Sequence, residues 1–390
     1  MKFLALLCTF SSILPVILAG PTPAISIETV QGGKTGRHIV VLKKGVGKSD
    51  VLSKVASISG VKPGTGVTHE WDAALNGFAG TFDKNTLAAL QATPGVASIV
   101  EDSIVNATAT MNNEPWGLAR INSKKRLGCL DGRIHSQLTY TYNYDSRAGQ
   151  GVDVYIIDTG IRVSHSDFGG RASWLGGFGG YPLQDGNGHG THCAGTAVGG
   201  RYGVAKAARV RAIKVLSDSG SGAVSDVISG INLALTTARG SGRPSVVSMS
   251  LGGAPNTALD AATRALVTAG VHVVVAAGNN NQDASTSSPA RVAEAITVGA
   301  STITDERASF SNYGPLIDVF GPGLNVISTW KDSDSSTATL SGTSMATPHV
   351  AGLIAYLISV QGNSTPAVMT QRLKDLALKG MLNPYSLRTF

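Results

Sequence analysis

The segment SGTSMATPHVAG, residues 341–352, places a candidate nucleophile, Ser344, among small residues at the start of an apolar run. A serine hydroxyl is a poor nucleophile near neutral pH, so a catalytic serine needs a general base and donors for the developing negative charge. Gly342 lets a substrate backbone come close, and the Ser344 amide at a helix N-terminus can point at an anion. Pro348 is expected in the first turn, where its missing N–H costs nothing. The same pattern also fits an ordinary turn, so the rest of the chain must decide.

Length and composition favour a folded α/β protein. The chain has 390 residues, 42% hydrophobic and 15% charged, which is enough for a sizeable core and more than one domain. Its 48 glycines follow no G-X-Y period and therefore indicate many tight turns. The net charge is +7, but the basic residues are scattered, so we expect no nucleic-acid partner.

The first residues have the pattern of a secretory signal. Lys2 precedes a largely apolar run over residues 3–18, and small residues follow at positions 19 and 20. No later segment reaches the ~18 to 20 apolar residues of a membrane span. We therefore expect a signal peptide at 1–19 and a secreted, extracellular, soluble protein without a membrane partner.

A secreted location bears on the cysteines and on glycosylation. Removal of Cys8 with the signal leaves Cys129 and Cys193, so the mature protein has at most one disulfide, and whether these two pair is open. Asn106-Ala-Thr and Asn363-Ser-Thr are acceptor motifs for N-glycosylation.

Residues 37–105 alternate between short strands and helices. Two helices are expected, one opened by Ser49 and Asp50 and one capped by Asp83. Such an alternation predicts a small α+β unit with an open sheet and helices on one face. Because the following stretch, 106–114, is small and polar like a cleavable linker, this unit is either a removable propeptide or an ordinary N-terminal domain. Strands are expected at 38–46, 78–82 and 96–105.

After Trp116 the alternation becomes longer. Nearly continuous apolar runs are typical of strands buried on both faces of a parallel sheet. Between them lie helical patterns, one capped by Ser225 and one running from Leu259 to a terminating Gly270. Right-handed crossovers then give a doubly wound α/β sheet whose site lies at the carboxyl ends of the strands. The runs are 152–157, 210–216, 246–251 and 271–277.

Polar residues stand at those strand ends. Asp158 ends DVYIIDTG, His189 lies in DGNGHGTHCAG, and Asn279 follows a strand in VVVAAGNNN. With Ser344 they supply a carboxylate, an imidazole, a hydroxyl and an oxyanion donor, which are the parts of an acyl-transfer site. Each alone has an ordinary reading as a cap, a loop residue or a turn. Together they predict a serine hydrolase.

The chain order narrows the type of hydrolase. Lipase-like folds run Ser, Asp or Glu, His with a G-x-S-x-G motif, whereas here the serine comes last. The chain contains neither the HExxH nor the CxxC spacing, so no catalytic metal is expected.

The motifs IIDTG, HGTHCAG, SLGG, AAGNN, SFSNYG and GTSMATPHVAG resemble the subtilisin superfamily, peptidase family S8, and in particular its fungal proteinase K-type branch. Residues 39–105 resemble the inhibitor-like propeptide of that family, with a ferredoxin-like fold. The resemblance implies a secreted serine endopeptidase of broad specificity, a monomer acting on proteins and peptides, with its propeptide as an intramolecular inhibitor. It places self-cleavage near Thr108–Ala109, with 20–108 as propeptide and 109–390 as peptidase domain. The stretch 106–110 is then expected to enter the substrate cleft.

The resemblance also assigns roles. Asp158 orients the imidazole, His189 acts as base and then acid, and Ser344 is the nucleophile, while Asn279 and the Ser344 amide form the oxyanion hole. His192 and His349 are supporting residues. The substrate backbone pairs with two edges of the cleft. The first pocket is open, and Leu216 and Val224 line a further apolar pocket. The edges and first pocket are Gly220, Ser221, Gly222, Ser250, Leu251, Gly252, Ala276, Ala277 and Gly278.

Several positions depart from the family pattern. The disulfides typical of the branch are missing, because their positions fall at Asp153, Ile296 and Met369. A structural calcium site is implied at Asp318, with carbonyls from Ala293 and Ala295, and the alternative is that Asp318 only caps a turn. A second calcium site is not expected, because Met381 stands where a carboxylate is needed.

Two further expectations concern a cysteine and the chain's unusual segments. Cys193 follows His189 by four residues, so the i, i+4 relation predicts a free thiol close behind the base. The segment 123–142 is longer than the family pattern, and the tail 383–390 is unlike the usual final strand. These differences leave a non-catalytic or misfolded relative as the alternative function.

Overall fold

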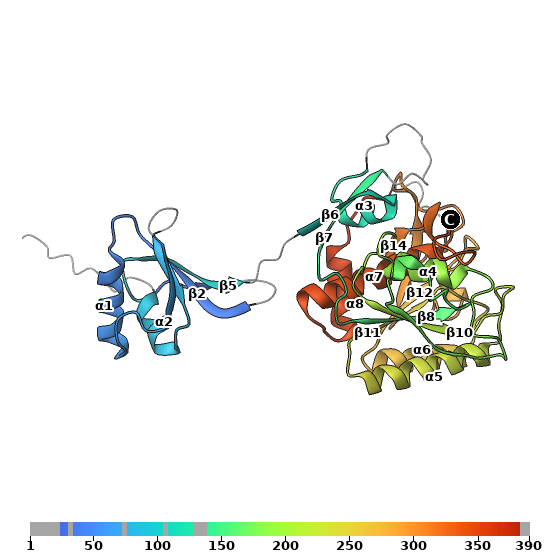
Figure 1. The fold of residues 1–390 in the computed structure, drawn as a ribbon, viewed down its shortest axis with the longest axis horizontal. Coiled ribbons are helices and arrows are strands. Elements are labelled where there is room, and N and C mark those ends of the chain that lie inside the picture. Colours follow the sequence, from blue (N-terminus) through green and yellow to red (C-terminus); the bar gives the residue numbers. More distant parts are fainter. Residues whose placement is uncertain (1–23, 30–33, 72–75, 104–107, 128–138, 383–390) are drawn as a thin grey trace, which may run out of the picture. The chain divides into compact units, whose positions relative to one another are not determined.

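The computed structural model describes residues 24–29, 34–71, 76–103, 108–127 and 139–382 (Figure 1). These form two compact units, Met1–Val105 and Asn106–Phe390. The expected signal peptide, the acceptor Asn106, Cys129 and the divergent tail lie outside the described residues.

The N-terminal unit is a five-stranded sheet with both of its helices on one face (Figure 1). The strand order is β1-β5-β2-β4-β3; β1 pairs parallel with β5, and the other pairs are antiparallel. Strands β2 to β5 with the two helices follow the order β-α-β-β-α-β, which is the predicted ferredoxin-like arrangement. The elements are β1 Ile27–Glu28, β2 Lys34–Leu42, α1 Lys48–Ser59, β3 Val67–Trp71, β4 Gly77–Gly80, α2 Lys84–Gln91 and β5 Val96–Ser103.

The elements predicted for this unit are present, and the unit also contains two strands that were not predicted. The Asp83 carboxylate caps α2 by accepting the Thr86 N–H at 2.7 Å, as predicted. Helix α1 starts at Lys48 after Gly47, slightly before the predicted Ser49. The sequence did not predict β1, which has only two residues, or β3, whose sequence VTHEW lacks an apolar alternation.

The larger unit is built on a seven-stranded, wholly parallel sheet. Its order is β14-β13-β12-β11-β8-β10-β9, so the chain places β9 and β10 on one side of β8 and then builds β11 to β14 on the other. The carboxyl ends around β8 therefore form the switch point at which open α/β sheets bind ligands. The strands are β8 Asp153–Asp158, β9 Ala172–Gly177, β10 Arg209–Lys214, β11 Ser245–Met249, β12 His272–Ala276, β13 Ile296–Ser301 and β14 Val319–Pro322.

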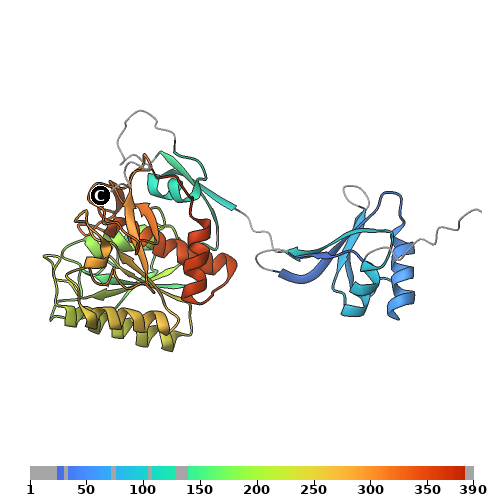
Figure 2. The ribbon, with the colours of Figure 1, turned by 180° about the vertical axis from the view of Figure 1, so that it is seen from behind.

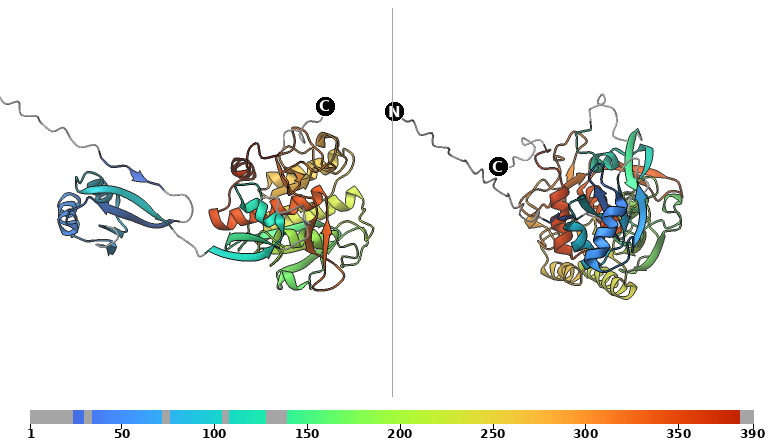
Figure 3. Two further views of the ribbon diagram at one scale, coloured as in Figure 1. Left: turned by 90° about the horizontal axis from the view of Figure 1, so that it is seen from above. Right: turned by 90° about the vertical axis from the view of Figure 1, so that its left-hand side faces the viewer.

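Helices cover both faces of this sheet, which explains the continuous apolar strands. Along β8, Val154 and Ile156 join one core cluster, whereas Tyr155 and Ile157 join the other. Helices α5, Val224–Ser241, and α6, Thr257–Thr268, run side by side on the second face (Figures 1 and 2). The first face carries the other helices, seen from two more directions in Figure 3. They are α4 His189–Val198, α7 Thr343–Gln361 and α8 Pro366–Leu376.

Helix α7 is a core helix. The expectation that no later segment is long and apolar enough for a membrane span was wrong, because α7 alone among the described helices has that length and hydropathy. However, 72% of its apolar window is buried inside the protein. Its residues Ala351, Ile354 and Ala355 are fully buried in the first core cluster. Packing against the sheet therefore accounts for its apolar sequence.

The remaining described elements lie outside the main layers. β6 Thr108–Glu114 pairs antiparallel with β7 Tyr140–Asp145, so the expected cleavage point, Thr108–Ala109, lies in a paired strand here. This arrangement differs from the expected extension of 106–110 into a cleft. The others are α3 Trp116–Asn122, η1 Ser166–Phe168, η2 Ala284–Thr286, β15 Val326–Thr329 and β16 Thr337–Leu340.

The boundaries of two helices differ from the sequence prediction. Helix α5 begins at Val224 after Ala223, so Ser225 is inside the helix and does not cap it. Helix α6 is capped by Asn256, whose side-chain oxygen accepts two backbone N–H groups at 3.0 Å. The sequence also missed β9, β13 and β14, because these short strands contain Gly or Pro and lack a long apolar run.

The positions of the missing disulfides are occupied by other interactions. The buried Asp153 carboxylate pairs with Arg243 Nε at 3.0 Å and lies 3.7 Å from Arg211. Ile296 and Met369, 2% and 0% exposed, belong to the same apolar cluster. Ion pairs and apolar packing therefore hold these positions.

Candidate active site

Asp158 and His189 meet at the end of the central strand. Asp158 is the last residue of β8 and fully buried, and His189 is the first residue of α4. The His189 Nδ1 atom lies 2.8 Å from Asp158 Oδ1. Because an ionised carboxylate only accepts hydrogen bonds, Nδ1 carries the proton in the neutral imidazole, and Nε2 is then the free base.

The electrostatic environment favours the protonated form of this imidazole. Burial alone lowers the pKa of His189, but the adjacent Asp158 charge and its hydrogen bond outweigh burial and raise the pKa well above the usual value. The pair therefore suits a base that takes a proton and holds the resulting imidazolium.

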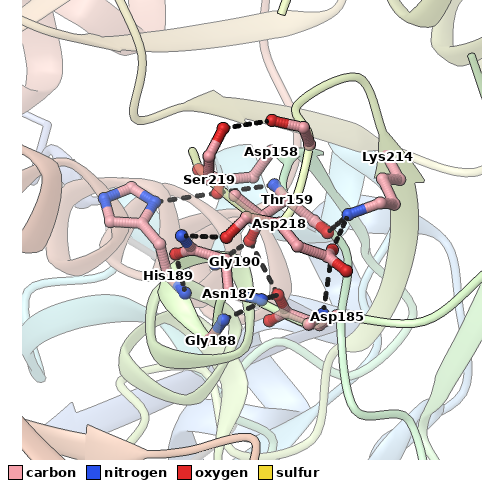
Figure 4. Close-up of polar contacts among 12 residues, drawn as sticks. Asp158, Thr159, Asp185, Asn187, Gly188, His189, Gly190, Lys214, Asp218 and Ser219 are labelled. Carbon is pink, nitrogen blue, oxygen red and sulfur yellow. Dashed lines mark hydrogen bonds and ion pairs between the residues drawn. The ribbon is translucent and has the colours of Figure 1, made fainter. Parts of the chain in front are cut away.

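A buried carboxylate, Asp185, fixes the loop that leads into α4 (Figure 4). It accepts hydrogen bonds from the Gly188 N–H at 2.7 Å, the Thr159 hydroxyl at 2.9 Å and the Thr191 N–H at 2.9 Å. Since Thr159 directly follows Asp158, Asp185 ties the end of β8 to the turn that carries His189.

Lys214 and Asp218 form the second part of this frame (Figure 4). The fully buried Lys214 ammonium donates to the Thr159 carbonyl at 2.6 Å and pairs with Asp218 at 2.8 Å. Asn187 donates to the Asp218 carbonyl and accepts the His189 N–H. Sequence reasoning missed Asp185, Lys214 and Asp218, although an acidic residue four positions before the histidine was a usable signal.

Ser344 lies at the start of α7, one residue after Thr343. Its hydroxyl donates to the Ser250 carbonyl at 3.2 Å. The described contacts include no hydrogen bond between Ser344 and His189, so rotation of the serine side chain must precede proton transfer. Such bonds often tighten only when substrate is present.

Pro348 lies in the second turn of α7, not in the first turn as predicted. As the sixth helical residue it lacks the N–H that would bond to the Ser344 carbonyl. That carbonyl instead accepts from the Ser250 hydroxyl at 2.9 Å and from Cys193 Sγ at 3.4 Å. The proline therefore leaves an acceptor that ties the serine to two neighbouring segments.

Asn279 and the Ser344 amide face one small space. The Asn279 side-chain oxygen accepts from the Thr343 N–H at 2.8 Å and from its hydroxyl at 2.9 Å, which fixes the amide orientation. A β carbon placed on Gly342 would lie 3.5 Å from both Asn279 Nδ2 and Ser344 N. Two donors thus converge where an oxyanion can bind.

A cleft of about 850 Å³ contains these groups. His189, Asn279 and Ser344 line it, as do the predicted apolar residues Leu216 and Val224. The predicted substrate edges and first pocket also line it, and all nine residues are Gly220, Ser221, Gly222, Ser250, Leu251, Gly252, Ala276, Ala277 and Gly278. Sequence reasoning missed other lining residues, which include Asn187, Gly253, Ala254, Pro255, Asn256, Thr286 and Ser287.

The other two histidines near the site are buried structural residues. His192 Nε2 contacts the carbonyls of Val326 and Ala338 at 3.0 and 3.2 Å, and burial lowers its pKa to about 3. His349 Nδ1 contacts the Met345 carbonyl at 2.9 Å, and burial lowers its pKa to about 4. Both are neutral near pH 7 and stabilise the backbone segments whose carbonyls they contact.

Cys193 is a free thiol behind the base, as predicted. It is fully buried, and its Sγ lies 4.0 Å from His189 Nδ1. Burial raises the pKa of the thiol, so it stays protonated near neutral pH.

The calcium site implied at Asp318, Ala293 and Ala295 does not fit the described contacts. Asp318 Oδ1 lies 2.6 Å from the Lys374 ammonium, and Oδ2 accepts the Thr297 N–H at 2.8 Å. The carboxylate already has a cation.

The predicted acceptor Asn363 is exposed, with its side-chain oxygen 2.9 Å from His272 Nε2.

A buried aspartate on an imidazole, a serine at a helix start and two convergent donors, all on a switch-point sheet, define a serine protease of the subtilisin type. The chain belongs to the subtilase family, because the sequence model described as "Subtilase family" matches residues 149–387. A second model, "Peptidase inhibitor I9", matches residues 37–108. The predicted resemblance and fold class are therefore confirmed.

Individual relatives agree with this assignment. The chain is 43% identical to a cuticle-degrading serine protease of Arthrobotrys oligospora over 93% of this chain and 91% of the relative. It is 44% identical to subtilisin-like protease 2 of Pseudogymnoascus destructans, over 97% and 95%. The crystal structure of a cold adapted subtilisin-like serine proteinase matches with a TM-score of 0.61 and 43% identity, over 70% of this chain and 94% of that one.

Proposed function

We propose that this chain is a secreted serine endopeptidase of broad specificity that removes its own I9-type segment. The proposal assigns 1–19 to a signal peptide, 20–108 to the propeptide and 109–390 to the peptidase domain. The observation that carries it is the convergence of Asn279 Nδ2 and Ser344 N beside a cleft that also contains His189.

In the proposed reaction, Ser344 Oγ attacks the substrate carbonyl carbon while His189 Nε2 takes the hydroxyl proton. Asn279 Nδ2 and the Ser344 N–H donate to the resulting oxyanion. The C–N bond then breaks, and the amine leaves with the proton from His189, which gives an acyl-enzyme. Water attacks this ester with the same base, and Asp158 stabilises the imidazolium in both halves.

Broad specificity follows from backbone recognition in this proposal. The described residues offer no partner for the backbone N–H of Gly222 or of Gly252, both on the cleft rim. An extended peptide can add between these two edges as a strand, and strand pairing reads backbone more than side chains. Ala276 and Gly278 leave a first pocket suited to apolar side chains.

Self-cleavage at Thr108–Ala109 requires the paired strand β6 to separate from β7 before the bond reaches Ser344. We therefore assign the β6–β7 pairing to the state after cleavage. Because the bond is part of the same molecule, its cleavage is intramolecular, fast and independent of concentration.

The test compares Ser344→Ala with Ser341→Ala, an exposed serine three residues earlier, in a host that lacks related proteases. Ser344→Ala removes the nucleophile but leaves the sheet intact, so we expect secretion of an uncleaved precursor without activity on casein. Ser341→Ala should be processed and active like the wild type. Equal processing of wild type and Ser344→Ala would contradict self-cleavage. Lack of processing and of activity in all three would favour the non-catalytic alternative.

A further inference from the structure

The corner of the larger unit around Asp318 joins three elements. Asp318 precedes β14, and its side chain is 11% exposed. Its N–H donates to the Thr297 carbonyl at 3.0 Å, and its Oδ2 accepts the Thr297 N–H at 2.8 Å. Strand β13 therefore fixes the carboxylate through Oδ2, and Oδ1 is the oxygen that meets a cation.

Helix α8 brings that cation. Lys374 lies in its last turn, with Nζ 2.6 Å from Asp318 Oδ1. The helix is anchored by Met369 and Leu373, which are 0% and 3% exposed in the first core cluster. Its start is capped by the Thr365 hydroxyl. Core packing therefore determines where the lysine stem begins.

Calcium chemistry does not fit this arrangement. Ca²⁺ takes about 6 to 8 oxygen ligands and prefers carboxylates. The other carboxylate of this corner, Glu294 between Ala293 and Ala295, pairs with Arg264 Nε at 2.8 Å. With an ammonium on Oδ1, a dication at the same oxygen would face like-charge repulsion at contact distance.

We propose that Lys374 is a built-in replacement for a calcium ion at Asp318. One covalently attached charge then neutralises the carboxylate and ties α8 to the β13–β14 edge. The stabilisation that a bound ion gives depends on the free concentration of that ion, whereas the lysine is part of the chain itself. Folding of this corner is therefore independent of calcium, whatever the enzyme's substrate.

The experiment measures thermal unfolding of the full chain carrying Ser344→Ala, so that self-digestion plays no part and the result does not depend on the proposed activity. We expect the same melting temperature in calcium chloride and in EGTA. Adding Lys374→Ala should lower it in EGTA by up to roughly 2 °C, the shift expected for loss of one partly exposed ion pair in a unit of this size. Calcium should restore part of that loss, because the carboxylate is then open to the ion.

Two control variants complete the design. Lys124→Ala removes an exposed lysine of the same unit and should change neither the melting temperature nor its calcium response. Asp318→Asn removes the carboxylate, so the Lys374→Ala, Asp318→Asn double variant should lose the calcium response.

Distinct results would overturn the proposal. The first is a melting temperature that falls in EGTA in the chain that keeps Lys374 but does not fall in the same chain with Asp318→Asn. Calcium would then occupy the Asp318 carboxylate. The other is an unchanged melting temperature and no calcium response in Lys374→Ala. A fall in EGTA that persists in Asp318→Asn would place calcium at another site, and the calcium response of Lys374→Ala would then decide for or against the proposal.

Discussion

Asp158, the last residue of β8, and Asp318, the residue before β14, are carboxylates at strand ends of one parallel sheet with different tasks. Both are largely buried, at 0% and 11% exposed, and each accepts a backbone N–H, from Thr159 and Thr297. They differ in the cation that each meets. Asp158 meets an imidazole that exchanges a proton and opens on a cleft, whereas Asp318 meets the Lys374 side chain at 2.6 Å. Whether such a carboxylate serves catalysis or stability therefore depends on its partner and on that partner's access to substrate, more than on the carboxylate itself.

The largest expected effect is on kcat, and it distinguishes Asp158 from Asp318 directly. Asp158→Asn should lower kcat by about 10⁴, because the amide donates to Nδ1 and stabilises the tautomer with a proton on Nε2. Asp318→Asn should leave kcat within about twofold and change only thermal stability, since ion pairs of this kind contribute roughly 1 kcal/mol or less. Steady-state hydrolysis of a peptide amide, with unfolding curves of both variants, checks the contrast. A loss below tenfold in Asp158→Asn would remove Asp158 from the mechanism.

The next effect concerns the donors that receive the oxyanion. Asn279→Ala should lower kcat by about 10² to 10³ with little change in KM, because the Nδ2–H bond matters mainly in the transition state. Asn232→Ala, an exposed asparagine on α5, is the matched control and should retain full activity. An equal loss in kcat and rise in KM would instead indicate a role in ground-state binding.

The pH profile gives a smaller and graded effect. Protonated His189 cannot take the serine proton, so kcat/KM should fall about tenfold per pH unit below the His189 pKa. Asp158 raises that pKa, so the acid limb should have its midpoint above the usual value of about 6.5. In Asp158→Asn the residual activity should extend to lower pH, because the raising charge is lost. A wild-type midpoint well below 6 would contradict the influence of Asp158.

Much of the fold was predictable because buried parallel strands and turn residues leave strong local patterns. The runs that became β8, β10, β11 and β12 were found from continuous apolar sequence. The edge strands β9 and β14 were not, since pairing with a neighbour, rather than side-chain pattern, makes them strands. Local rules also misplaced Pro348, because the helix start at Thr343 is set by tertiary hydrogen bonds to Asn279.

Some residues of the candidate site were likewise predictable from the sequence and others were not. Asp158, His189, Asn279 and Ser344 were found from sequence motifs. In the structure His189, Asn279 and Ser344 line one cleft, and Asp158 is buried against His189. Asp185 and Lys214 were missed, because their role depends on contacts between loops far apart in sequence. The partner of Asp318 was missed for the same reason, as Lys374 lies far from it along the chain.

The measurement that tests the central claim most directly is the site of covalent modification by phenylmethylsulfonyl fluoride. An activated serine displaces fluoride from the reagent and forms a sulfonyl ester, so mass spectrometry of the digested protein locates the nucleophile. We predict one adduct per molecule, on Ser344, formed in proportion to the loss of activity and greatly slowed in Asp158→Asn. Complete loss of activity with Ser344 unmodified, or an adduct on another residue, would contradict the account.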